Sequence, residues 1–232
     1  MNLSERLRRV REEIDAACLD AGRRTDSVCL IAVSKRFGAD AIREAFAAGQ
    51  VDFGENYAEE LVGKAAVLTT DIRWHWIGHI QRRNVKKLDQ TPVLVHTLSR
   101  LDVLEQFHKR YGKELPDFLV QVNIGREPQK SGIMPDQLEA FLDAVEQVAY
   151  DVTIRGLMVI PPRVDNVKEA RSAFAQTREL GHRHQKRFFN QRVELSMGMS
   201  SDYALAISEG ATMVRIGTKI FGDRPSSVRK EG

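Results

Sequence analysis

Short apolar runs alternate with amphipathic segments along almost the whole chain. The run VCLIAVS at residues 28–34 is rich in β-branched residues, which is typical of a buried strand. It is followed at 39–49 by ADAIREAFAAG, whose apolar positions recur at helical spacing and which ends in a glycine. The same alternation predicts eight strands, at residues 28–34, 51–54, 72–78, 92–98, 117–124, 152–160, 193–198 and 212–217.

Each predicted strand is followed by a helical segment. These segments cover residues 39–49, 56–68, 84–89, 101–112, 134–148, 167–188, 201–210 and 218–222. Short apolar strands that alternate with helices predict parallel βα units, and eight units of about 25–30 residues match a small TIM-type (β/α)8 barrel. An open doubly wound sheet is the alternative, but no Gly-x-Gly-x-x-Gly follows the first strand. We therefore expect residues 1–232 to form one α/β domain, a single (β/α)8 barrel.

An extra helix is predicted at the N-terminus, within residues 1–24. It should begin at Asn2, where Glu5 completes a capping box, and end near Gly22. The acidic residues of this segment are unlike a transit peptide, and no run in the chain is long enough to span a bilayer. We expect a cytoplasmic protein with no membrane partner, whose tail, residues 224–232, is loose.

The composition adds exclusions rather than a function. Of 232 residues, 42% are hydrophobic and 29% are charged, which is typical of a soluble globular protein. The formal charge of +3 does not demand nucleic acid. The basic segments QRRNVKK and RHQKR are an alternative sign of nucleic-acid binding, but no aromatic residues interleave with them, so solvated helix faces and no nucleic-acid partner are expected. The two cysteines form neither a disulfide framework nor a metal site.

The chemistry of a barrel lies where its strands end and its βα loops begin. The predicted strand ends carry three cations and several small polar residues, and they hold no Cys/His cluster with metal spacing. We expect no metal. The candidates for a ligand site at these ends are Lys35, Asn56, His75, Lys130, Met197, Ser200, Ser201, Arg215, Gly217 and Thr218.

Lys35 directly follows the first strand and its Ser34. A lysine that extends from a strand end to solvent is the commoner case. The alternative is a nucleophile, because a partly apolar pocket disfavours the ammonium form and lowers the pKa of a lysine. A neutral amine attacks a carbonyl to give a Schiff base, and pyridoxal phosphate (PLP) is the commonest aldehyde partner.

The segments MGMSSDYALAISEG and VRIGTKIFG offer a phosphate cradle. Ser200 and Ser201 stand where the seventh strand turns into a helix, although N-capping by Ser201 or Asp202 would explain them without a ligand. Gly217 permits a close backbone approach, and Thr218 donates from backbone and side chain. Barrel phosphate sites commonly use the loops after strands seven and eight, which carry both segments.

Arg215 should lie inside the barrel mouth, two residues before Gly217. A pyridine nitrogen would accept its hydrogen bond, and a permanently charged guanidinium would keep that nitrogen unprotonated. The alternative is a buried salt bridge, for which the neighbouring sequence offers no acidic partner.

With these residues identified, the chain resembles the pyridoxal phosphate homeostasis proteins, single-domain relatives of the barrel of alanine racemase. The matching segments are LIAVSK, FGENYAEE, WHWIGHIQ, VQVNIGREPQKSGI, RGLMVIPP and ELSMGMSSDYALAISEGATMVRIGTKIFG. The family often reads IGxLQxNK after its third strand, whereas Arg83 and Asn84 stand here in place of Asn and Lys. This departure concerns a contact at the rim.

The resemblance implies a role for each candidate. Lys35 would carry the Schiff base, and Asn56, His75 and Met197 would lie near the cofactor. Ser201, Gly217 and Thr218 would hold the phosphate with Ser200 close by, Arg215 would face the pyridine nitrogen, and Lys130 would serve in transfer or as a secondary site.

The resemblance also implies a cofactor-binding protein of PLP homeostasis that delivers PLP to apo-enzymes. The alternative is an amino-acid racemase of low activity. Racemases of this fold take a tyrosine from a separate domain on a partner subunit, and none of the four tyrosines here is an evident counterpart. We accordingly expect a non-catalytic monomer.

Overall fold

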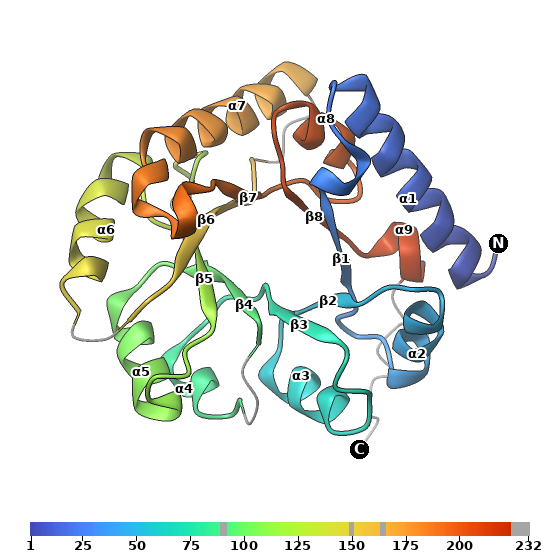
Figure 1. Cartoon of the computed structure of the whole chain (residues 1–232), viewed down its shortest axis with the longest axis horizontal. Coiled ribbons are helices and arrows are strands. Elements are labelled where there is room, and N and C mark those ends of the chain that lie inside the picture. Colours follow the sequence, from blue (N-terminus) through green and yellow to red (C-terminus); the bar gives the residue numbers. More distant parts are fainter. Residues whose placement is uncertain (89–91, 149–150, 163–165, 224–232) are drawn as a thin grey trace.

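The computed structural model describes residues 1–88, 92–148, 151–162 and 166–223, and these contain eight parallel strands closed into a barrel (Figure 1). The strands are β1 (Cys29–Val33), β2 (Asp52–Glu55), β3 (Arg73–Trp76), β4 (Leu94–Leu98), β5 (Asp117–Val122), β6 (Ile154–Val159), β7 (Glu194–Ser196) and β8 (Met213–Ile216). Each strand pairs with the next in chain order, and β8 pairs with β1. The predicted (β/α)8 fold is confirmed.

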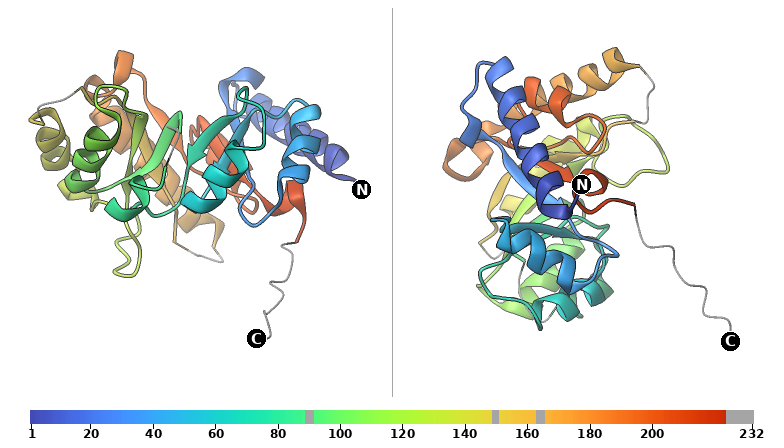
Figure 2. Two further views of the ribbon diagram at one scale, coloured as in Figure 1. Left: turned by 90° about the horizontal axis from the view of Figure 1, so that it is seen from below. Right: turned by 90° about the vertical axis from the view of Figure 1, so that its right-hand side faces the viewer.

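Helices surround the barrel on its outside, as both directions of view show (Figures 1 and 2). They are α1 (Leu3–Asp20), α2 (Ala39–Ala47), α3 (Ala58–Ala65), α4 (Arg82–Val85), α5 (Leu101–Tyr111), α6 (Leu138–Glu146), α7 (Val167–Arg183), α8 (Tyr203–Ser208) and α9 (Thr218–Phe221). Within the described ranges, no helix combines the length and the apolar character that crossing a membrane requires. The tail predicted at 224–232 lies outside the described residues.

Helix α1 is the predicted N-terminal addition to the barrel. The Asn2 side chain accepts a hydrogen bond from the Glu5 N–H at 2.9 Å, and the Glu5 carboxylate accepts one from the Asn2 N–H at 2.9 Å, which completes the capping box. The helix lies beside α8 and α9, at the seam where the last βα unit meets the first (Figure 1). There Glu13 accepts hydrogen bonds from Tyr203 and Lys219. Helix α1 therefore braces the two helices that follow β7 and β8.

The barrel has an apolar layer inside it and a larger apolar layer between strands and helices. The inner cluster consists of Ile31, Leu94, Leu119, Met158 and Met213. Side chains on a strand alternate between faces, so residues two positions after an inner residue also point inward. This alternation places Val33 after Ile31 and Arg215 after Met213 on the inner face. Both series lead from the apolar interior to the end of the barrel where the strands end, which is its carboxyl mouth.

Candidate functional site

Lys35 lies at the mouth, two residues beyond the last residue of β1. It belongs to the turn that follows Ser34, and it is half-buried. Because β1 pairs with β8, this turn begins next to the loop that follows β8.

A buried polar cluster holds the turn that carries Lys35. Arg36 has a positive φ of 67°, and its N–H donates to the Glu60 carboxylate at 2.7 Å. Lys64 of α3 donates to the Ser34 carbonyl at 3.0 Å and forms ion pairs with Glu55 at 2.7 Å and Glu60 at 2.8 Å. The ammonium group of Lys64 thus holds the turn on both sides of Lys35: it contacts Ser34 directly and Arg36 through Glu60.

Glu55, at the end of β2, is the innermost member of this cluster. Its Oε1 accepts from the Ser34 hydroxyl at 2.6 Å and from Lys64. Burial raises the pKa of the Glu55 carboxyl, and Lys64 opposes that effect. The sequence analysis missed this cluster. The i,i+4 spacing of Glu60 and Lys64 was the only sign of the cluster in the sequence. Nothing in the sequence near that pair indicates its contact with Ser34, which is 30 positions from Lys64.

The loops after β7 and β8 lie next to each other and next to β1. The Arg215 N–H donates to the Gly198 carbonyl at 3.0 Å, which joins β8 to the loop after β7. Gly217 lies so near β1 that a Cβ there would be 3.3 Å from the Val33 carbonyl oxygen. Ser200 is half-buried, and Ser201 and Thr218 are exposed. The predicted phosphate residues and Lys35 therefore occupy neighbouring strand ends of one mouth.

Two expectations for these loops are modified by the structure. Helix α8 has 6 residues and α9 has 4, so a phosphate there would rely on loop N–H groups and hydroxyls, not on a long helix dipole. Met197 stands on the opposite strand face from Ser196, and its side chain is fully buried in the outer apolar core. The structure thus gives the Met197 side chain a packing position rather than one in the mouth.

Arg215 is buried inside the barrel, 5% exposed. It donates from Nη1 to Ser196 Oγ at 2.6 Å and from Nη2 to the Val159 carbonyl at 3.0 Å. Burial lowers its pKa to about 10, against the field of Asp202, so the guanidinium stays charged at neutral pH. Among the described residues no carboxylate forms a salt bridge with it. The guanidinium is therefore a charged, buried donor inside the barrel, at the carboxyl ends of β6 and β7.

A further part of the mouth contains Asn56, which follows β2, and Lys130, which follows β5. They line a cavity of about 220 Å³ together with side chains from the ends of β4 and β5. Asn56 Oδ1 is buried and has no hydrogen-bond partner in the described part of the chain. Lys130 donates to the Pro161 carbonyl at 2.9 Å and pairs with Glu127 at 2.6 Å. Lys130 follows β5, which lies across the barrel from β1, so Lys35 and Lys130 stand on opposite sides of the same mouth.

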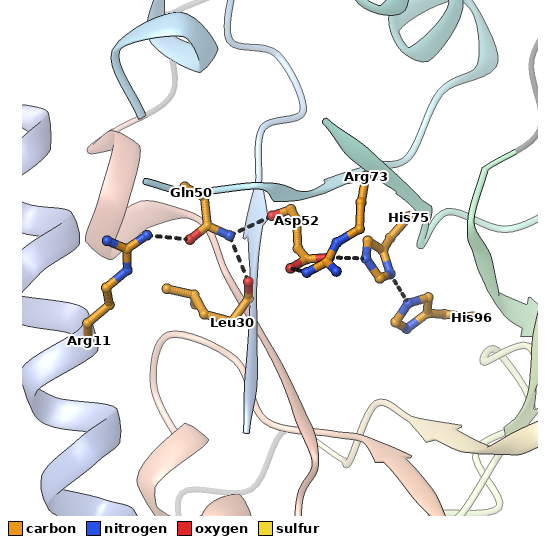
Figure 3. A network of polar contacts seen from close by, with 7 residues as sticks. All are labelled: Arg11, Leu30, Gln50, Asp52, Arg73, His75 and His96. Atoms are coloured by element: carbon orange, nitrogen blue, oxygen red, sulfur yellow. Dashed lines mark hydrogen bonds and ion pairs between the residues drawn. The ribbon is translucent and has the colours of Figure 1, made fainter. Parts of the chain in front are cut away.

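His75 lies deeper than the sequence analysis placed it. Strand β3 ends at Trp76, so His75 is an interior strand residue and not a loop residue of the mouth. Its Nε2 is 3.0 Å from Asp52 Oδ1, and its Nδ1 is 3.0 Å from His96 Nε2 (Figure 3). The structure brings His75 to Asp52 at the amino end of β2, away from Lys35. No group of three or more His, Cys, Asp or Glu in the described residues is placed to hold a metal.

Comparison with known proteins places this chain in a family. The family model described as alanine racemase, N-terminal domain, matches residues 11–225. A pyridoxal phosphate homeostasis protein of Aquifex aeolicus is 39% identical over 97% of this chain and 99% of its own length. Another, of Pseudomonas aeruginosa, is 41% identical over 96% of each chain. The solved structure of PipY from Synechococcus elongatus with PLP bound is 37% identical, with a TM-score of 0.82, over 95% of this chain and 100% of that one.

The fold and the matched family model define a barrel of the alanine racemase N-terminal type. Within that class, the full-length identities show that the chain belongs to the pyridoxal phosphate homeostasis proteins. This confirms the resemblance drawn from the sequence motifs. The relatives' names describe homeostasis of a cofactor and specify no reaction.

Proposed function

We propose that this protein binds PLP in the carboxyl mouth of its barrel as a Schiff base on Lys35 and acts in PLP homeostasis. The observation that carries the proposal is the pairing of β1 with β8, because the segments after these strands, which carry Lys35 on one side and Gly217 and Thr218 on the other, begin next to each other. One ligand can therefore reach an amine and an anion-binding loop together. The PLP-bound structure of PipY, which aligns over 95% of this chain, supports the choice of ligand.

The residues of the mouth fit the three polar parts of PLP. Lys35 supplies an amine for the aldehyde. Ser201, Thr218 and the backbone at Gly217 supply hydroxyl and N–H donors for the phosphate, with Ser200 next to them. Arg215 is a buried guanidinium with donors to spare for the ring nitrogen, since its named partners are Ser196 and Val159. Asn56, whose Oδ1 is buried without a hydrogen-bond partner in the described part of the chain, lines the neighbouring cavity with Lys130.

PLP, when bound, supplies an aldehyde that a primary amine can capture. Lys35 attacks in its neutral form: its nitrogen replaces the aldehyde oxygen, which leaves as water, and the amine loses its two protons in the process. The polar cluster at Ser34 and Arg36 fixes the direction from which the amine approaches.

We infer a carrier rather than a catalyst. Arg215 donates to the ring nitrogen and leaves it unprotonated, which weakens the ring as an electron sink. Two tyrosines have their hydroxyls engaged: Tyr111 donates to the Leu88 carbonyl and Tyr203 to Glu13. Tyr57 is exposed at the start of α3, and Tyr150 lies outside the described residues.

Three finer roles belong to the same proposal. Lys130, across the mouth from Lys35, is the candidate for transfer of PLP. The recipients would be PLP-dependent apo-enzymes. The chain would act as a monomer.

An absorption spectrum of the purified protein with PLP, before and after borohydride, tests the proposal. We expect a yellow chromophore that borohydride bleaches as it reduces the imine to a secondary amine. Incubation with L- and D-amino acids, followed by chiral analysis, distinguishes the racemase alternative. A protein that forms no imine chromophore with PLP would contradict the proposed binding. Turnover of an amino acid at ordinary enzyme rates would contradict the carrier function.

A further inference from the structure

A continuous line of hydrogen bonds crosses the interior of the barrel. It starts at Asp52, which Arg73 contacts on the amino side, and passes through His75 to His96 (Figure 3). It continues from His96 Nδ1 to Ser196 Oγ at 2.8 Å and from Ser196 Oγ to Arg215 at 2.6 Å. The line therefore joins a carboxylate at the amino ends of the strands to the guanidinium in the mouth.

The chemistry of the two ends fixes the direction of the first and last bonds. A guanidinium can only donate, so Ser196 Oγ accepts from Arg215. Burial alone would raise the pKa of Asp52, but hydrogen bonds from His75 and Arg73 outweigh it and leave that pKa below its usual value. Asp52 is thus an ionised carboxylate, which can only accept, so His75 donates from Nε2.

The middle bonds follow from the charge of the two imidazoles. Burial, with the charge of Arg215, holds the pKa of His96 well below its usual value, so His96 is neutral and has one N–H. With a neutral His75, Nδ1 accepts and His96 donates to it from Nε2. His96 Nδ1 then accepts from the Ser196 hydroxyl. Every bond in the line donates toward Asp52.

An arrangement with a charged His75 leaves the Ser196 hydroxyl proton without an acceptor in the described part of the chain. If His75 were charged, its Nδ1 would donate to His96, which would then donate from Nδ1 to Ser196. Ser196 would accept from both His96 and Arg215, and its hydroxyl proton would have no acceptor among the hydrogen bonds of the described residues. A second cation would also enter an interior that already contains Arg215. The charged groups around His75 that bear on this choice are Asp52, Arg73, Arg155, Glu194 and Arg215.

We propose that Asp52, His75, His96 and Ser196 are positioning residues for Arg215, with Asp52 fixing the imidazole tautomers so that Ser196 presents a lone pair to the guanidinium. This inference rests on the proposed function, in which Arg215 donates to the ring nitrogen of PLP. The Asp52 end opens to a cavity of about 680 Å³ at the amino ends of the strands. A residue at one end of the barrel thereby orients a ligand-facing group at the other.

The tautomers are measured by long-range ¹H–¹⁵N NMR of the histidine rings in the cofactor-free wild-type protein. We expect both His75 and His96 to be protonated at Nε2 and not at Nδ1. A charged His75, or an Nδ1–H on either ring, overturns the proposal. This measurement involves no cofactor, so its result is independent of whether PLP binds.

Variants of the line then test the positioning of Arg215 in the PLP-loaded protein. Ser196→Ala and Asp52→Leu should each shift the absorption maximum of the chromophore, and Ser196→Thr, which keeps the hydroxyl, should restore the wild-type spectrum. Gln50→Met is the matched control: Gln50 is equally buried beside Asp52 but donates to the Leu30 and Asp52 carbonyls, outside the line (Figure 3). An unshifted Ser196→Ala spectrum, or a Gln50→Met shift as large as that of Asp52→Leu, overturns the proposal. A wild-type protein without any chromophore would instead contradict the proposed function.

Discussion

Ile31 of β1 is the register partner of Arg215 of β8. Because both strands run in the same direction, the residues beyond this pair reach the mouth side by side: Lys35 from β1, Gly217 and Thr218 from β8. The closure of the barrel, which unites the first and last strands, is therefore what assembles the site. Ile31 and Arg215, which are 184 positions apart in the chain, become neighbours through one strand pairing.

The phosphate cradle is tested by removing one donor at a time. Thr218→Ala and Ser201→Ala should each weaken PLP binding by about 1–2 kcal/mol, the contribution of a hydrogen bond to a charged group. Both hydroxyls lie at the mouth and are accessible to a ligand. Titration of each variant with PLP and with pyridoxal provides the control, because pyridoxal carries no phosphate and its affinity should be unchanged. Wild-type PLP affinity in both variants would place the phosphate elsewhere.

The Lys64 cluster should be essential to stability because Lys64 neutralises a carboxylate that has no access to water. Lys64→Met leaves Glu55, which is 0% exposed, without its ion pair. Loss of one partner of a buried pair predicts destabilisation by about 3 kcal/mol in urea unfolding. Glu55→Gln in the same chain removes the unpaired charge, so the double variant should be more stable than Lys64→Met alone. A double variant that is less stable than Lys64→Met would contradict this account of the cluster.

The contact between α1 and the last two helices should make stability depend on pH. Hydrogen bonds from Lys219 and Tyr203 lower the pKa of Glu13 to about 2. A carboxyl with a depressed folded-state pKa contributes stability above its unfolded pKa, and the contribution is lost as pH falls from about 4.5 toward 2. Glu13 is partly exposed, so Glu13→Gln should cost no more than about 1 kcal/mol at pH 7.

The measurement for Glu13 is urea unfolding of wild type and Glu13→Gln at pH 7 and pH 3. The difference between the two proteins should be smaller at pH 3. Glu12→Gln is a suitable control, since Glu12 pairs only with Arg8 on the exposed side of the same helix in the described structure. An equal difference at both pH values would show that the ion pair does not stabilise the fold.

Much of the fold could be predicted because it depends on local pattern. Every strand of the structure lies within a segment that the apolar runs marked, apart from Glu55, which extends β2 by one residue beyond the predicted 51–54. The capping box at Asn2 and Glu5 was predicted for the same reason, since both residues belong to one turn. Helix α3 begins at Ala58 and not at 56, because Asn56 and Tyr57 complete the turn after β2.

The interior polar contacts could not be predicted in the same way. Ser196 and His96 are 100 positions apart, and only the closed barrel sets their side chains 2.8 Å from each other. His75 shows the limit most clearly. Its position near a strand end suggested the mouth, whereas the pleat turns its ring into the barrel toward Asp52. The candidates after β1 and β8 could be assigned to one end of the barrel because their order after each strand was sufficient to place them, and their roles stay a prediction.

Peptide mapping of the borohydride-reduced protein tests the central claim most directly. The wild-type protein and a Lys130→Arg variant should each carry one PLP-derived adduct, located at Lys35. Lys35→Arg keeps a positive charge but cannot form the imine, so it should carry none. An adduct at Lys130 or another lysine, or stoichiometric trapping in Lys35→Arg, would contradict the assignment of Lys35 as the amine that holds PLP.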